Sequence, residues 1–214
     1  MRFQISLGIL VAMALLFFIS APKVSPSDLD QKTIVTFTGP VEIPGKALPP
    51  GTYVFKVLDN VANRDVIQVL DKDEKHVYGT FLGIPVETDK PPEKPIIRFK
   101  ETAPGAPPAI EAWFYPGRTD GHELVYPRQH AVELAKANNQ NVASTANNMA
   151  SNTTSANDKN DASVAQMKNA TVNRVTPEGK EVKVTKIQIV SLTPTAGESQ
   201  MQTDGSHSSS RELP

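Results

Sequence analysis

The sequence predicts an all-β domain, an antiparallel sandwich or small barrel, with one short helix at its C-terminal end and a disordered tail after it. Segments in which apolar and polar residues alternate recur about every 10 residues between positions 32 and 137, and Gly, Pro and charged turn sequences separate them. Every aromatic residue after Phe18 lies between Phe37 and Tyr126. Because aromatic side chains dominate core burial, these limits mark the folded domain. Short, evenly spaced strands of this kind are typical of sandwiches and small barrels.

Six segments between residues 32 and 137 have the period-two pattern of half-buried strands. In chain order they are TIVTF (33–37), GTYVFKVLD (51–59), DVIQVLD (65–71), HVYGTFLGIPVE (76–87), PIIRFKE (95–101) and AIEAWFY (109–115). The sequences LPPG, NVANR, KDEK, TDKPPEK and APGAPP separate them and are rich in turn-forming residues. Gly79 and Gly83 fall inside a strand pattern, where a bulge or a close packing contact is the ordinary reason for glycine.

One segment of the domain, PRQHAVELAKA (127–137), predicts a helix. Proline is tolerated in the first turn of a helix, and helical spacing places Ala131, Leu134 and Ala135 on one face. We expect this helix to close the domain at residue 137 by covering an edge or an end of the sheet.

The chain after the helix is predicted to be mostly disordered. Residues 138–170 form a polar, low-complexity linker with too little apolar surface to offset the entropy of ordering it. Residues 171–193 have strand character on both sides of a TPEGKE turn and predict an accessory hairpin. A lone hairpin is marginal in water, so this one either docks on the domain, pairs with a partner or stays unfolded until bound. Residues 194–214 are a polar tail.

The N-terminal residues 1–27 predict export. One positive charge at Arg2 precedes an apolar run from Ile5 to Ile19, which is shorter than the ~20 residues of a membrane-spanning helix and is typical of a signal peptide. Small residues at the −3 and −1 positions favour cleavage before Asp28, and an uncleaved N-terminal anchor is the alternative. We therefore expect the protein in the periplasm or cell envelope, with membrane contact only through this segment if it is uncleaved.

Composition excludes several classes of function. The net charge is −1 and the pI about 6.4, so no excess of basic residues indicates a nucleic acid partner. The chain has no cysteine, and residues 32–137 contain no serine, so neither a Ser/His/Asp nor a Cys/His apparatus can be built in the domain. His76, His122 and His130 lack the local spacing of zinc ligands. We expect no catalytic residues, metal or cofactor.

The segment EAWFYPGRTDGHELVYP (111–127) is the candidate ligand-binding region. It contains the only tryptophan of the chain, and two interpretations remain open. In the first, Trp113 is a core residue of a hairpin. In the second, Trp113, Tyr115 and Tyr126 form an exposed aromatic platform, bordered by Glu111 and His122, that binds a cell-wall glycan or an envelope protein.

Strand pairing within this segment also has alternatives. Alternation places Glu111, Trp113 and Tyr115 on one face of a strand. A six-residue PGRTDG loop would pair Tyr115 with His122 and Trp113 with Leu124, and a one-residue shift with the Trp face inward is the other possibility.

The predicted function is that of an exported, non-enzymatic module of the cell envelope that binds a glycan or a protein partner or has a structural role. The alternative is an enzyme similar to carboxylate-dependent glycoside hydrolases. Such an enzyme needs a pair of carboxylates, and Glu111 and Glu123 could face each other across the hairpin.

Four sequence stretches carry a resemblance to a known group of proteins. They are KTIVTFTGPVEIPGKALPPGTYVFKVLD, EKHVYGTFLGIP, PPAIEAWFYPG and ELVYPRQHAVELAKA. Together they resemble a family of exported acidobacterial proteins of unknown function, over residues 32–137. The resemblance implies an exported location and names no activity.

Overall fold

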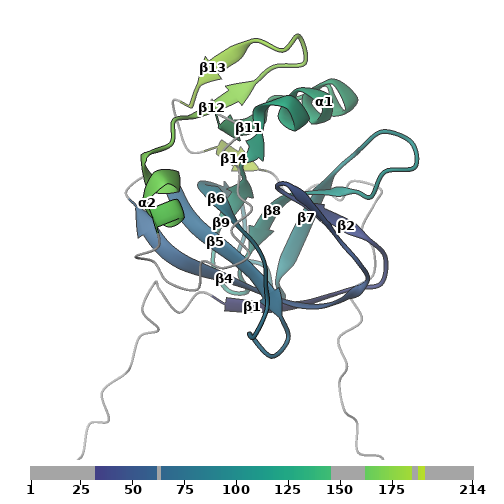
Figure 1. The fold of residues 1–214 in the computed structure, drawn as a ribbon, viewed down its shortest axis with the longest axis vertical. Helices are drawn as coiled ribbons and strands as arrows, with labels where there is room; N and C mark the ends of the chain where they lie inside the picture. The colour runs from purple at the N-terminus through teal and green to yellow at the C-terminus, as the bar shows by residue number, and fades with distance from the viewer. Residues whose placement is uncertain (1–31, 62–63, 146–161, 185–187, 191–214) are drawn as a thin grey trace, which may run out of the picture.

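The computed structural model describes residues 32–61, 64–145, 162–184 and 188–190, and the described chain is mostly β, as the sequence predicts (Figure 1). The strands are β1 (Lys32–Phe37), β2 (Val41–Ile43), β3 (Lys46–Leu48), β4 (Gly51–Val61), β5 (Arg64–Asp71), β6 (Val77–Thr88), β7 (Ile96–Lys100), β8 (Ala109–Phe114), β9 (Asp120–Leu124), β10 (Tyr126–Pro127), β11 (Val142–Thr145), β12 (Val172–Val175), β13 (Glu181–Lys183) and β14 (Gln188–Val190). The helices are α1 (Arg128–Asn138) and α2 (Ala162–Asn169).

The larger of the two sheets, sheet A, curls around the main core. Its strand order is β1-β4-β5-β6-β9-β8-β2-β3, with β7 paired to β8 and β14 paired to β6. The indole N–H of Trp113 on β8 donates to the hydroxyl of Thr33 on β1 at 3.1 Å, although β1 and β8 are far apart in the strand order. The sheet therefore bends until strands from distant positions face each other, as in a small barrel.

Strand β1 illustrates why alternation in the sequence leads to this sheet. Thr33, Val35 and Phe37 are buried, whereas the residues between them are exposed. Its antiparallel partner β4 pairs Thr33 with Phe55 and Val35 with Tyr53, so both strands direct their large side chains to the same side.

Sheet B, with the order β10-β11-β12-β13, contains the first differences from the sequence prediction. β10 and β11 are parallel, and α1 is the crossover between them. β11 lies inside the segment predicted as a disordered linker. Val142 and Ala143 are both fully buried, and they belong to two different apolar clusters, one on each side of the strand. Two apolar residues in a polar run are thus enough to anchor a short central strand.

Helix α2 also falls inside the predicted linker, so the prediction of disorder over 138–170 is wrong for residues 142–145 and 162–169. Val164 and Met167 of α2, one turn apart, are buried in a cluster with Val66 and Leu82 of β5 and β6. Figure 1 shows α2 beside β5 at the edge of the molecule. The sequence did not predict this helix, because the segment is polar and of low complexity and the apolar contacts of the helix lie on one narrow face.

Residues 172–183 form the predicted hairpin, which docks on the domain. β12 pairs antiparallel with both β11 and β13. The turn between β12 and β13 has Gly179 at φ +78°, a conformation that favours glycine, and its N–H donates to the carbonyl of Thr176. Docking explains how a short hairpin is held, because Val175 contributes to the main core.

Helix α1 packs on the domain through the predicted face, but the prediction that it closes the domain at residue 137 is wrong, because β11 and β12 follow it and contribute Val142 and Val175 to the main core. Ala131, Leu134 and Ala135 are its buried residues, and Pro127 occupies the N-cap position without a side-chain hydrogen bond to the helix. The helix ends at Asn139, whose left-handed conformation (φ 51°, ψ 37°) turns the chain into the loop before β11. Figure 1 shows α1 and the β12–β13 hairpin together at one end of the molecule.

His130 holds α1 against β2 through an ionic contact. Its Nε2 lies 2.8 Å from Oε1 of Glu42, and its Nδ1 lies 3.1 Å from Oε2 of Glu133. The hydrogen bond to Glu42, which outweighs the opposing effect of burial, raises the pKa of His130 above its ordinary value of 6.5.

A raised pKa in the folded state makes stability depend on pH. Protonated His130 stabilises the fold fully below its unfolded-state pKa of 6.5, and this contribution is lost as the pH rises through the higher folded-state pKa. We expect the stability advantage of the parent over His130→Gln to shrink as the pH rises above 6.5 and passes through the raised folded-state pKa. Urea unfolding of both proteins across this range measures it, and a constant difference would contradict the proposed ionic contact.

The predicted signal peptide or anchor (1–27) and the tail (194–214) lie outside the described residues, as do parts of the predicted linker and of the 171–193 segment. Neither described helix has the length and apolar character needed to cross a membrane.

Candidate functional site

Of the two interpretations of segment 111–127, the exposed aromatic platform is wrong, and Trp113 is a core residue of a hairpin, as the other interpretation predicts. Trp113 and Tyr126 are fully buried, and Tyr115 is 5% exposed. The Trp113 ring makes an edge-on contact with Phe55 at 5.7 Å between centroids and lies 4.5 Å from the ring of Tyr115. The hydroxyl of Tyr126 donates to the carbonyl of Ile110 at 2.7 Å. These rings fill the interior of sheet A, because curling of the sheet places their face inside.

The observed register differs from both predicted pairings. Trp113 pairs with His122 instead of Leu124, a shift of two residues that leaves the Trp face inward. Between β7 and β8 the pairing passes from Arg98–Ala112 to Phe99–Ile110, so Glu111 has no partner on β7. This irregularity is a β-bulge, and a bulge changes the direction of the side chain that it contains.

The bulge separates Glu111 from Trp113. Simple alternation would direct both side chains to the same face. Glu111 instead contacts Lys100 and, together with Ala112, lines a pocket outside the main core, while Trp113 points inward. Of the five candidate binding residues, Glu111 is therefore the only one at this pocket.

His122, another of the five, belongs to a buried polar chain with Tyr115 and Asp65. Its Nδ1 lies 2.7 Å from Oδ2 of Asp65, and its Nε2 lies 3.0 Å from the hydroxyl of Tyr115. Burial raises the pKa of Tyr115, so its hydroxyl keeps its proton within this chain of contacts. All three residues are at most 5% exposed, which favours a structural role for this chain of contacts.

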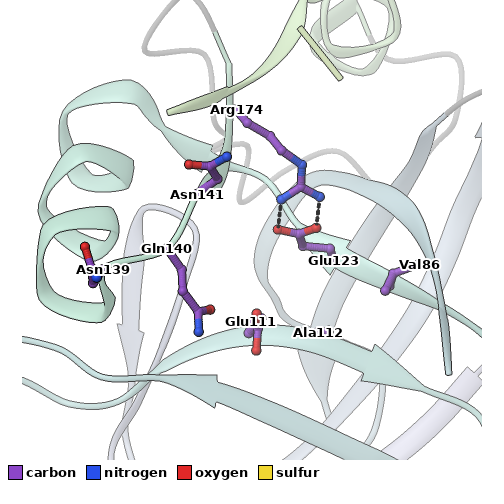
Figure 2. A pocket seen from close by; sticks show the side chains of 8 residues that line it. All are labelled: Val86, Glu111, Ala112, Glu123, Asn139, Gln140, Asn141 and Arg174. Carbon is purple, nitrogen blue, oxygen red and sulfur yellow. Dashed lines mark hydrogen bonds and ion pairs between the residues drawn. The ribbon is translucent and has the colours of Figure 1, made fainter. Parts of the chain in front are cut away.

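The candidate site is a polar pocket of about 390 Å³ where sheet A meets sheet B, here called the inter-sheet pocket (Figure 2). Sheet A contributes residues of β6, β8 and β9, the loop between α1 and β11 contributes three consecutive amide side chains, and β12 contributes an arginine. The lining residues are Val86, Glu111, Ala112, Glu123, Asn139, Gln140, Asn141 and Arg174.

Glu111 forms one wall of the pocket and is held by two cations. Its Oε1 accepts a hydrogen bond of 2.7 Å from Nζ of Lys100, a side chain that is only 4% exposed. Its Oε2 lies 3.6 Å from Nε of Arg98, which is too far for a hydrogen bond. The second carboxylate oxygen therefore keeps acceptor capacity toward the pocket.

The pair of Glu123 and Arg174 joins the two sheets. Nη1 of Arg174 lies 3.0 Å from Oε1 of Glu123, and Nη2 bonds to Oε2, as the dashed lines in Figure 2 show. Both side chains are more than nine-tenths buried. This bidentate contact fixes the orientation of the guanidinium and the carboxylate, so it sets the position of β12 over β9.

The loop after α1 supplies neutral polar groups at the opening of the pocket. Asn139, Gln140 and Asn141 are all exposed. In Figure 2, Gln140 extends from the loop toward Glu111, and Asn141 lies beside Arg174. Each side-chain amide offers both donors and an acceptor to a molecule in the pocket.

Sequence reasoning identified the two carboxylates of this pocket and missed its other polar residues. The sequence offers Glu111 and Glu123 as a carboxylate pair, but it places residues 139–141 in a linker and Arg174 in an accessory hairpin. The asparagine run was visible in the sequence. Nothing local, however, indicated that Arg174 would lie against a residue 51 positions away.

Searches for similar proteins gave no match, whether against family models, curated proteins or solved structures.

Proposed function

We propose that this protein is an exported, non-enzymatic module of the cell envelope that binds an envelope glycan in the inter-sheet pocket. The proposal rests on one observation. The pocket combines exposed side-chain amides, those of Asn139, Gln140 and Asn141, with charged side chains that ion pairs hold in place. Its volume of about 390 Å³ falls within the range of about 300–1,000 Å³ that is usual for small-ligand sites.

The lining supports a ligand rich in hydroxyl groups. The amides of Asn139, Gln140 and Asn141 and the carboxylate of Glu111 provide donors and acceptors in several directions. The carboxylate and guanidinium groups are preoriented by their ion pairs, which lowers the entropic cost of ordering the site upon binding.

The same contacts favour binding over glycoside hydrolysis. A hydrolase needs one carboxyl group that protonates the leaving oxygen and a second that acts as a base or nucleophile. Both oxygens of Glu123 are engaged by Arg174, and Oε1 of Glu111 is engaged by Lys100. Neither carboxylate presents both of its oxygens to a substrate.

Export to the envelope is supported by the apolar run from Ile5 to Ile19 behind Arg2. Glycans are abundant polymers of the cell envelope, so an exported protein is exposed to them. The polar lining of the pocket agrees with a glycan ligand.

Co-sedimentation of the full-length chain with isolated cell-wall sacculi tests the proposal. We expect the parent to pellet with sacculi and Gln140→Ala to pellet about tenfold less, because the variant removes one donor and acceptor from an exposed loop without changing the core. Gln129→Ala, the same substitution at an exposed position of α1 outside the pocket, is the matched control.

Equal pelleting of Gln140→Ala and Gln129→Ala would place the binding elsewhere on the protein. A parent that stays in the supernatant would overturn glycan binding itself.

A further inference from the structure

We infer that the inter-sheet pocket binds its glycan through the protonated free amine of an amino sugar and prefers this sugar to its N-acetylated form. This inference rests on the proposed function and specifies its ligand. Three features of the pocket carry it: the open oxygen of Glu111, the charge of the lining and the burial of its two apolar residues.

Oε2 of Glu111 is the acceptor that an ammonium group would use. Lys100 donates to the other oxygen, Oε1, at 2.7 Å, while Nε of Arg98 lies 3.6 Å from Oε2, which is beyond hydrogen-bond distance. A carboxylate has acceptor sites on both of its oxygens, so Glu111 can accept from Lys100 and from a ligand at the same time. Lys100 and Arg98, neither of which lines the pocket, therefore hold the carboxylate without using the hydrogen-bonding capacity of Oε2.

The lining carries more negative than positive charge. It contains the carboxylates of Glu111 and Glu123 and a single guanidinium, that of Arg174. Both terminal nitrogens of Arg174 bond to Glu123, so the charge of the guanidinium is offset within this pair. The remaining charge of the lining is that of Glu111, and opposite charges attract more strongly in a partly enclosed site than in open water.

The amides at the opening supply the other acceptors that an ammonium group needs. A protonated primary amine has three N–H donors and no acceptor, whereas an acetamido nitrogen has one N–H. The side-chain carbonyls of Gln140 and Asn141 can accept two of these hydrogen bonds while Oε2 of Glu111 accepts the third. In Figure 2, Gln140 extends from its loop toward Glu111, which allows both side chains to contact one amine.

An acetyl group gains little in this pocket. Val86 and Ala112 are the two apolar lining residues, and they are only 1% and 2% exposed. An acetyl methyl group would therefore cover almost no apolar surface of the protein. Acetylation also removes the positive charge of the sugar nitrogen, so it removes the attraction to Glu111.

The test compares two disaccharides by calorimetric titration of the full-length chain. One is the β-1,4-linked dimer of glucosamine with both amines free, and the other is the same dimer with both amines acetylated. We expect the free amine to bind at least about tenfold more tightly, because a hydrogen bond between charged groups is stronger than one between neutral groups.

A charge series at an exposed position assigns this preference to the pocket. Gln140→Lys places a cation at the opening of the pocket and is expected to lose most of the preference, whereas Gln140→Glu is expected to increase it. Gln129→Lys makes the same change of net charge at an exposed position of α1 outside the pocket, and we expect it to keep the preference.

Equal binding of the two dimers, or tighter binding of the acetylated one, would overturn the inference, as would binding of neither. Equal loss of the preference in Gln140→Lys and Gln129→Lys would also overturn it, because attraction to the net charge of the protein would then explain the difference.

Co-sedimentation with sacculi separates failure of this inference from failure of the proposed function. In each of the cases that overturn the inference, a parent chain that still pellets with sacculi through Gln140 would leave glycan binding in place with a different specificity. A parent chain that does not pellet would overturn both.

Discussion

Replacing Arg174 with methionine is expected to lower the free energy of unfolding by about 3 to 5 kcal/mol. The substitution leaves the carboxylate of Glu123 buried without its partner, since both of its oxygens bond to Arg174 in the parent. An unpaired buried charge is far more costly than the loss of an exposed ion pair. Urea unfolding followed by circular dichroism measures the change.

Two further variants assign this loss to the buried pair. Arg118→Met removes an arginine whose ion pair with Asp120 is 42% exposed on both sides, and we expect it to cost at most about 1 kcal/mol. Combining Arg174→Met with Glu123→Leu removes both charges and is expected to recover most of the stability. A loss in Arg174→Met no larger than that in Arg118→Met would show that water reaches Glu123 and that the pair does not fix sheet B.

Replacing Trp113 with alanine is expected to cost about 3 to 5 kcal/mol, because it deletes the largest fully buried side chain of the described core. The cavity would lie among Phe55, Tyr115 and His122, whose rings now contact the indole. Thermal or urea unfolding reports the loss directly.

The milder Trp113→Phe separates the size of the ring from its polar contact. Phenylalanine retains most of the apolar surface but leaves the hydroxyl of Thr33 without the indole donor at 3.1 Å, so an intermediate loss is expected. If Trp113→Ala unfolded at the same urea concentration as the parent, the ring would not be part of the core.

Local pattern predicted those elements of this fold whose side chains divide cleanly between inside and outside. The alternation in β1 and the buried face of α1, formed by Ala131, Leu134 and Ala135, followed directly from residue spacing. The short strands β2 and β3, on either side of a turn with Gly45 at φ +82°, were missed because three residues are too few to show a period.

The pocket was less predictable than the fold because it depends on contacts between distant segments. The bulge at Glu111 breaks the alternation that placed this residue beside Trp113, and nothing in AIEAWFY indicates it. Composition identified residues 139–141 as polar but not as the lining of a pocket, which depends on the turn at Asn139 and on β11 after it. Residue spacing alone did not decide whether the Trp113 face is exposed or buried, because that depends on the curling of sheet A, which encloses it.

The predicted stability effects bear on function because Arg174 has two roles. It fixes β12 over β9, and it lines the pocket beside Asn141. Variants at the exposed amides are therefore the better probes of binding, since they change the ligand contacts and leave the buried pair intact.

The most direct measurement of the central claim is a titration of isotopically labelled full-length protein with a soluble digest of sacculi, followed by backbone and side-chain amide resonances. Glycan binding in the inter-sheet pocket predicts shifts concentrated at Asn139, Gln140 and Asn141 and at the neighbouring amides of Glu111 and Ala112. Shifts confined to another surface, or a spectrum unchanged at saturating digest, would contradict it.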